Sequence, residues 1–143
     1  QLVGVYSLEM ARLYNYLLQQ SEKPFTIIHS LDGYDEISLT NDTKVITNKG
    51  ESVKTPEELG KRMVQQEDIY GGGTVEESAE IFKRILSGNG TWAQNAVVLA
   101  NAAMGLHCTG KYPSYEDAYK AAVDSLDSGK ANEVLKKLIQ LNS

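Results

Sequence analysis

A short apolar segment, Phe25–His29, is the feature that most restricts how this chain can fold. It is rich in β-branched residues, which is typical of a strand that is buried on both faces. A similar segment, Leu2–Tyr6, lies upstream, and the residues between the two have the spacing of an amphipathic helix. Strand, helix and strand in this order predict a βαβ unit, with two parallel neighbouring strands and a right-handed crossover.

The helix of this unit is predicted to begin after Ser7, a residue type that caps helices well, and to end near Gln20. Apolar side chains recur along it at i, i+3, i+4, i+7 and i+8, so they share one helical face. The predicted face consists of Met10, Leu13, Tyr14, Leu17 and Leu18.

The residues after the second strand predict a turn that carries acidic side chains. Asp32–Gly33 is a strong turn signal, because glycine adopts positive φ freely and aspartate bonds to nearby backbone. Ile37–Thr40 alternate apolar and polar residues and are predicted as a strand. Asp35 and Glu36 are therefore expected where a loop enters a strand, a position from which side chains can point into a cleft.

The remaining chain predicts hairpins and then helices. We expect strands over 43–47 and 52–54, a short helix from Thr55 to near Gly60, and irregular structure over 61–70. Helices are predicted over 75–86, 91–108, 114–126 and 130–141. The predicted fold class is thus α/β, with a mixed sheet started by a parallel βαβ unit, followed by antiparallel hairpins and a C-terminal set of four helices.

Two of these helices lead to expectations about burial. The helix over 91–108 is apolar nearly all round and is expected to be the most buried. The helix over 75–86 is expected to bury one apolar face, made of Ala79, Phe82, Ile85 and Leu86.

Length and charge restrict the class of protein. The chain has 143 residues, enough for one domain with a core, and a net charge of −5 with scattered lysines and arginines, which disfavours a nucleic-acid groove. No apolar run is long enough to span a bilayer, and no leader is recognisable. The single cysteine, Cys108, excludes an internal disulfide and favours the cytosol. Because a core strand follows Gln1 at once, we expect a fragment, a processed chain or a truncated one.

Asp32, Asp35 and Glu36 allow two interpretations. Carboxylates at a strand edge are hard oxygen ligands of the kind that Mg²⁺ uses, together with water and substrate phosphates. An ordinary solvated turn also explains every residue type here, and on spacing alone it is the better explanation.

Other candidate residues have simpler explanations. His29 could carry a proton or orient a ligand, but a hydrogen-bonded buried histidine is favoured. His107 and Cys108 are interpreted as core or helix-end residues. Gly71–Gly73 could bind an anion before a helix, although a hinge is favoured. Trp92 could offer a stacking surface, although packing is favoured.

Several segments, in order along nearly the whole chain, resemble the C-terminal half of the anthranilate phosphoribosyltransferase family. The most specific is the Gly-x-Asp-Glu element Gly33–Glu36, with a histidine upstream and an expected strand downstream. The matching segments are Gln1–Ser7, Ile28–Ser30, Asp32–Ser38, Gly71–Gly72, Glu76–Ala79, Leu86–Gly88, Asn101–Ala103 and Ser128–Ala131.

The resemblance implies an enzyme of tryptophan biosynthesis that joins anthranilate to ribose C1 of phosphoribosyl pyrophosphate and releases pyrophosphate. It implies that Asp35 and Glu36 bind Mg²⁺ and, through the ion, the diphosphate; it assigns no other catalytic residue. It further implies a fold like that of class II nucleoside phosphorylases and a homodimer or other homo-oligomer. The charge, the single cysteine and the lack of a recognisable leader or membrane-spanning run predict a cytoplasmic protein with neither nucleic acid nor membrane as a partner.

The same resemblance implies that residues 1–143 are a single α/β-domain fragment. The N-terminal helical domain and the glycine-rich phosphate loop of the family would lie upstream of Gln1. The fragment alone is expected to be inactive and to self-associate through an exposed strand edge and apolar face. Two alternatives remain: a non-catalytic nucleic-acid-binding relative on the same fold, and a relative of pyrimidine-nucleoside phosphorylase.

Overall fold

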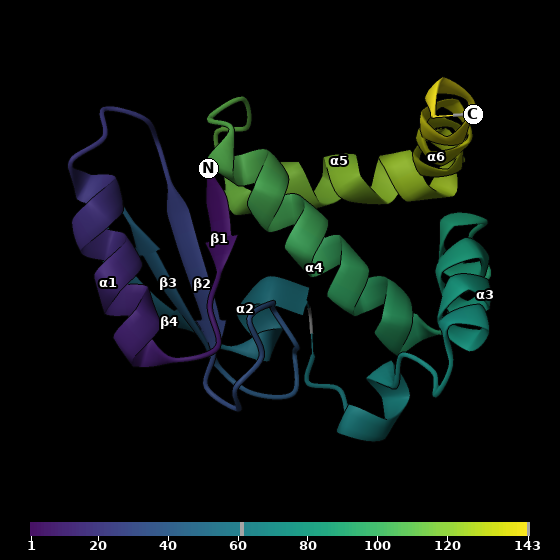
Figure 1. The fold of residues 1–143 in the computed structure, drawn as a ribbon, viewed down its shortest axis with the longest axis horizontal. Helices are drawn as coiled ribbons and strands as arrows, with labels where there is room; N and C mark the ends of the chain where they lie inside the picture. Colours follow the sequence, from purple (N-terminus) through teal and green to yellow (C-terminus); the bar gives the residue numbers. More distant parts are fainter. Residues whose placement is uncertain (61, 143) are drawn as a thin grey trace.

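A four-stranded mixed sheet forms one half of the molecule, and most of the helices gather beside it (Figure 1). The computed structural model describes residues 1–60 and 62–142. The strands lie side by side in chain order and are β1 (Leu2–Gly4), β2 (Thr26–Ser30), β3 (Thr43–Thr47) and β4 (Gly50–Lys54).

The helices follow the predicted order and nearly the predicted bounds. They are α1 (Leu8–Gln19), α2 (Pro56–Gly60), α3 (Val75–Leu86), α4 (Trp92–Cys108), α5 (Tyr115–Asp127) and α6 (Lys130–Leu141). The predicted irregular stretch 61–70 contains a short 3₁₀ helix, Gln66–Ile69, while its first residue lies outside the described residues. The predicted α/β fold class is confirmed.

The strand pairing follows the prediction for β1 with β2 and for β3 with β4, while the pairing of β2 with β3 was not predicted. β1 and β2 are parallel, with Val3 opposite Ile27, as a βαβ unit requires. β2 pairs with β3 in antiparallel register, which places Ile27 opposite Ile46, and β3 forms an antiparallel hairpin with β4. β2 is therefore an inner strand, and all five of its residues are buried.

Helices cover the two faces of this sheet (Figure 1). Alternate residues of β2 point to opposite faces, so Ile27 packs in a cluster with residues of α1 while Ile28 packs in a cluster with residues of α4. The expectation that α4 is the most buried helix is confirmed, since it has the largest set of buried residues: Ala93, Ala96, Ala100, Ala103 and Met104.

Two predicted helical faces are partly wrong. On α1, Leu13 and Leu17 are 53% and 63% exposed, because the helix rests on the sheet through a face centred on Ala11, which is 1% exposed. On α3, Phe82 is 51% exposed although Ile85 is buried. Periodicity identified both helices correctly, but it did not identify which apolar side chains have a surface to pack against.

The predicted strand Ile37–Thr40 is also wrong, because this segment is an irregular loop. Its alternation has a different cause: Ile37 and Leu39 are both 0% exposed and belong to the cluster beneath α4. Leu39 has φ of 60°, a left-handed conformation that no regular strand contains, and its carbonyl accepts a 3.0 Å hydrogen bond from Val64 N. The loop thus buries alternate side chains without a strand partner.

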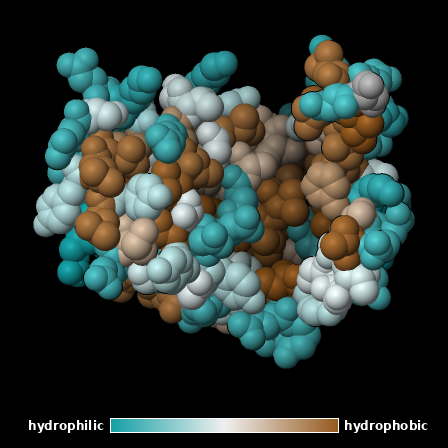
Figure 2. All heavy atoms as spheres, viewed as in Figure 1, coloured by the Kyte–Doolittle hydropathy of each residue, from teal (hydrophilic) through white to brown (hydrophobic). Residues whose placement is uncertain are grey.

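Apolar surface remains exposed on the helical half of the molecule. Figure 2 shows brown, apolar atoms around the hollow that separates α4 from α3 and α6. A groove of about 460 Å³ there is lined by residues such as Val98, Ala102 and Leu126. On α6, Val134 and Leu138 are 68% and 56% exposed. No helix in the described parts of the chain, 1–60 and 62–142, has the length and apolarity needed to cross a membrane.

The burial of Ile37 leads to a stability prediction. Ile37→Ala should lower the free energy of unfolding by about 2 to 5 kcal/mol, as in a core site, although the residue lies in a loop. The matched change in the same loop, Leu31→Ala, removes a side chain that is 45% exposed and should cost about 0.5 kcal/mol or less. Urea denaturation of both variants measures the difference, and equal effects would contradict the packing described.

Candidate functional site

The loop that leaves the end of β2 presents two exposed carboxylates, those of Asp35 and Glu36. It closes on itself through backbone hydrogen bonds, from Ser30 N to Tyr34 O at 3.0 Å and from Leu31 N to Asp42 O at 2.9 Å. Among residues 1–60 and 62–142, no hydrogen bond or ion pair joins either side chain to another group. Both carboxylates are therefore available to a ligand.

The backbone beneath these side chains is held by three different elements, beginning with β1. A Cβ atom built on Gly4 would overlap the carbonyl oxygen of Asp35. The close approach of the two backbones consequently requires glycine at this position.

The second contact comes from the last residue of β2. Ser30 Oγ donates a 2.7 Å hydrogen bond to Glu36 O and accepts one of 3.2 Å from Ser38 N. It lies 3.1 Å from Thr43 Oγ1 on β3; because its own hydrogen is already engaged, the Thr43 hydroxyl is the donor. Ser30 is 0% exposed, so this small network is shielded from water.

The third contact comes from the middle of α4. The side-chain amide of Asn101 accepts a 2.9 Å hydrogen bond from Ile37 N and donates one of 2.9 Å to Ile37 O. The same amide nitrogen donates to Val97 O, one turn back along the helix, at 2.9 Å. Three consecutive backbone units, those of Asp35, Glu36 and Ile37, are thus fixed by β1, β2 and α4.

Asp32, the third acidic residue of the predicted cluster, has a different environment. Its carboxylate accepts hydrogen bonds from the hydroxyls of Ser38, at 3.4 Å, and Thr40. The predicted turn is present, because Gly33 has φ of 100° and its N–H bonds to Ser30 O at 2.9 Å. Asp32 therefore helps to close the loop, while Asp35 and Glu36 remain free at its surface.

The arrangement fits a weakly coordinated divalent cation better than a closed metal cage. Among the described residues, no three His, Cys, Asp or Glu side chains come together at one place. Mg²⁺ binds through one or two carboxylates and completes its shell with water and phosphate oxygens. Two free carboxylates on a fixed backbone are such a donor set.

The other candidates of the sequence have structural roles. His29 is 5% exposed, and its Nδ1 lies 2.9 Å from Val5 O, which confirms the interpretation as a buried hydrogen-bonded histidine. Before α3, the backbone N–H of Gly73 already donates a 2.7 Å hydrogen bond to Glu77 Oε2, so a carboxylate of the same chain takes the place that an anion would need. The packing expected of Trp92 is wrong: it is 44% exposed, and the guanidinium of Arg62 stacks 3.6 Å from its ring centre.

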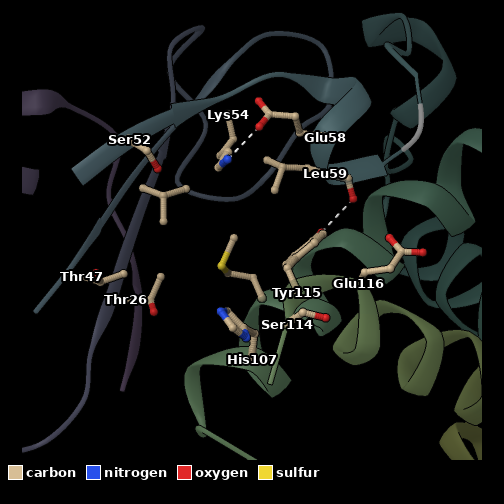
Figure 3. Close-up of a pocket in the computed structure, with 12 residues that line it drawn as sticks. Thr26, Thr47, Ser52, Lys54, Glu58, Leu59, His107, Ser114, Tyr115 and Glu116 are labelled. Atoms are coloured by element: carbon tan, nitrogen blue, oxygen red, sulfur yellow. Dashed lines mark hydrogen bonds and ion pairs between the residues drawn. The ribbon is translucent and has the colours of Figure 1, made fainter. Parts of the chain in front are cut away.

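A separate hollow of about 520 Å³ lies at the other end of the sheet, beside Thr26 and Thr47 (Figure 3). His107 points into it from the end of α4, and its buried Nδ1 has no partner among the described residues. Tyr115 forms another wall and donates to Leu59 O at 2.8 Å, while burial raises the pKa of its phenol. Asp35 and Glu36 are not part of this lining, because they follow the opposite end of β2.

Sequence reasoning missed the residues that hold the acidic loop. Asn101 offers the clearest signal, since it is a polar residue in the middle of a nearly apolar helix, where an amide needs a buried partner. Gly4, inside a strand, is a second signal, because glycine in a strand often marks a close backbone approach. Neither signal shows which segment of the chain lies opposite.

Comparison with known families assigns this architecture to a class. The family model described as "Glycosyl transferase family, a/b domain" matches residues 1–132. The chain therefore belongs to this glycosyl transferase family.

Within this class, the chain is similar to anthranilate phosphoribosyltransferases. It is 53% identical over 142 residues to that of Flavobacterium psychrophilum and 46% identical over 143 residues to that of Bacteroides thetaiotaomicron. These matches cover 99% and 100% of this chain but 43% of each relative, so the chain spans less than half the length of either protein.

Solved structures give the same result. The crystal structure of anthranilate phosphoribosyltransferase from Thermus thermophilus superposes with a TM-score of 0.83 at 30% identity, over 94% of this chain and 40% of that one. The enzyme from Saccharomyces cerevisiae, solved in complex with PRPP and Mg, has a TM-score of 0.80 at 22% identity, over 94% and 39% of the two chains. At this identity, the similarity to the yeast enzyme shows only that the two proteins share a fold.

The close approach at Gly4 can be tested directly. Gly4→Ala should displace the Asp35 backbone and lower the free energy of unfolding by about 1 to 3 kcal/mol, as overpacking does. The amide NMR signals of Asp35 and Glu36 should shift more than those of α6. The control, Gly105→Ala, has ordinary space around the new methyl group and lies inside a helix, so it should be neutral or stabilising by up to about 1 kcal/mol. Unchanged Asp35 and Glu36 signals in Gly4→Ala would contradict the contact.

Proposed function

We propose that this chain supplies the cation-binding part of an anthranilate phosphoribosyltransferase, which transfers the phosphoribosyl group of phosphoribosyl pyrophosphate to anthranilate and releases pyrophosphate. The observation that carries the proposal is the pair of free carboxylates, Asp35 and Glu36, on a backbone fixed from three sides. The similarity to enzymes of this name at 46% to 53% identity, and the Mg and PRPP bound to the yeast enzyme, support it.

The chemistry explains why such a loop is useful. In the transfer, the bond from ribose C1 to the diphosphate oxygen breaks, a bond from C1 to the anthranilate nitrogen forms, and that nitrogen releases one proton to water. Negative charge grows on the departing diphosphate, and Mg²⁺, when bound, offsets that charge. Asp35 and Glu36 provide its oxygen ligands, and their anchored backbone keeps them in position, so little reorganisation is needed during the reaction.

We further propose that residues 1–143 form one α/β-domain part of the enzyme and that the reaction also needs residues outside this stretch. The relatives are more than twice as long as the matched region, which supports this division. The site described here provides cation ligands, while a cradle for the phosphates and a pocket for anthranilate remain to be supplied. The 143-residue chain alone is expected to have no transferase activity.

The cation ligands can be tested by removing both charges. In the 143-residue chain, Asp35→Asn with Glu36→Gln should abolish the broadening that Mn²⁺ causes in NMR signals of this loop, because the neutral amides bind the ion poorly. In the enzyme of full length that contains this segment, the same change should abolish Mg²⁺-dependent consumption of anthranilate.

The matched control, Glu22→Gln with Asp124→Asn, removes one glutamate and one aspartate charge from exposed positions elsewhere and should leave both measurements unchanged. Retained activity in the double variant at Asp35 and Glu36 would contradict the proposed ligands.

Two other results would favour the alternative functions. Phosphorolysis of thymidine or uridine by the full-length enzyme would favour a nucleoside phosphorylase, and salt-dependent retention of DNA would favour a nucleic-acid-binding relative.

We also propose that the protein acts in the cytoplasm as a homo-oligomer. A single cysteine supports the first part, and the exposed apolar side chains of α6 support the second. Light scattering of the 143-residue chain should give an apparent mass that rises with concentration. Val134→Lys with Leu138→Lys, on the exposed face of α6, should reduce the association. A monomer at every concentration would contradict self-association.

A further inference from the structure

We propose that Asn101 is a positioning residue for the cation site: its amide holds the backbone at Ile37 and so determines where Asp35 and Glu36 present their carboxylates. The inference rests on the proposed function, because it takes these two residues as the cation ligands. It adds a residue that is distant in sequence and lies on another element, α4.

The geometry of the contact is specific. The N–H and the C=O of Ile37 both bond to one side chain, each at 2.9 Å, so the Asn101 amide replaces the backbone of a neighbouring strand. The third bond, to Val97 O at 2.9 Å, fixes the orientation of the amide on its own helix. Ile37 needs an acceptor for its N–H and a donor for its C=O, and the Asn101 amide supplies both from one side chain.

Helix stability does not account for an asparagine at this position. Asparagine is a poor residue for a helix interior, since its side chain competes for backbone hydrogen bonds. Asn101 is half-buried, and Ala100 and Ala103, close to it in the helix, are both 0% exposed. A partly buried amide in such a place is unfavourable unless it is hydrogen-bonded, and the bonds it makes are those to the acidic loop and to Val97.

The contact acts on the carboxylates through a short path. Ile37 is adjacent to Glu36 and is 0% exposed, so it cannot turn its backbone groups to water. Gly4 and Ser30 restrain the two preceding residues, and Asn101 provides the third restraint. Loss of that restraint leaves two buried backbone groups unpaired, and the loop must shift to satisfy them. The carboxylates then move relative to one another and to any bound phosphate.

The test compares two identical substitutions in one helix. Asn101→Leu removes the contact at similar side-chain size. Asn95→Leu, also on α4, is the comparison, because within residues 1–60 and 62–142 the Asn95 side chain makes a single hydrogen bond, to Gly90 O at 3.4 Å, away from the acidic loop. Mn²⁺ is titrated into the 143-residue chain, and the concentration that gives half of the paramagnetic broadening of loop NMR signals is measured. Thermal unfolding of every variant reports the fold.

Asn101→Leu should raise the Mn²⁺ concentration that gives half of the broadening about tenfold or more, because groups that orient metal ligands typically have an effect of this size. The same variant should speed hydrogen exchange at the Ile37 amide. Asn95→Leu should leave Mn²⁺ binding unchanged. If Asn101→Leu does not fold, Asn101→Asp gives the answer, because the carboxylate still accepts from Ile37 N but cannot donate to Ile37 O.

The outcomes separate the two proposals. If a folded Asn101 variant binds Mn²⁺ as tightly as the unmodified chain, the positioning role is overturned and the proposed function stays intact. Mn²⁺ binding that survives Asp35→Asn with Glu36→Gln would overturn the proposed ligands and, with them, this inference. An equal loss of binding in Asn95→Leu and Asn101→Leu would show a general effect of helix stability and would also overturn the positioning role.

Discussion

The packing of α4 against one face of β2 and β3 is the contact on which the rest of the structure depends. Ala96 and Ala100 of this helix belong to one buried cluster with Ile28 and Val45 of the sheet. Because α1 covers the opposite face, β2 is buried along its whole length. The loop that leaves β2 is consequently held beside α4, and only this proximity allows one amide of the helix to satisfy the backbone at Ile37.

The fold could be predicted from the sequence where the pattern that determines an element lies within that element. The parallel βαβ unit and the helices were predictable because apolar periodicity and capping residues lie within each segment. It was harder to predict which side of a helix is buried. Leu13 and Phe82 recur at the helical period yet are exposed, because burial depends on a neighbouring surface that no local pattern describes. Ile37–Thr40 failed for a similar reason, since their alternation reflects a distant amide and a helix instead of a strand partner.

The acidic pair shows what the structure adds to a short motif. On spacing alone, Asp35 and Glu36 are indistinguishable from a solvated turn. The structure separates them from Asp32, whose carboxylate is engaged by the hydroxyls of Ser38 and Thr40, and shows that their own carboxylates make no such bonds among the described residues. The anchoring groups could not be predicted, because Gly4 and Asn101 become neighbours of the loop only after the sheet and α4 have assembled.

α4 also has a mechanical consequence for the site. Asn101 holds the acidic loop, while the adjacent residue, Ala102, and Val98 line the apolar groove towards α3 and α6. The same turn of α4 therefore supports the backbone at Ile37 on one side and borders the groove on the other, so a substitution that shifts this turn would alter both surfaces.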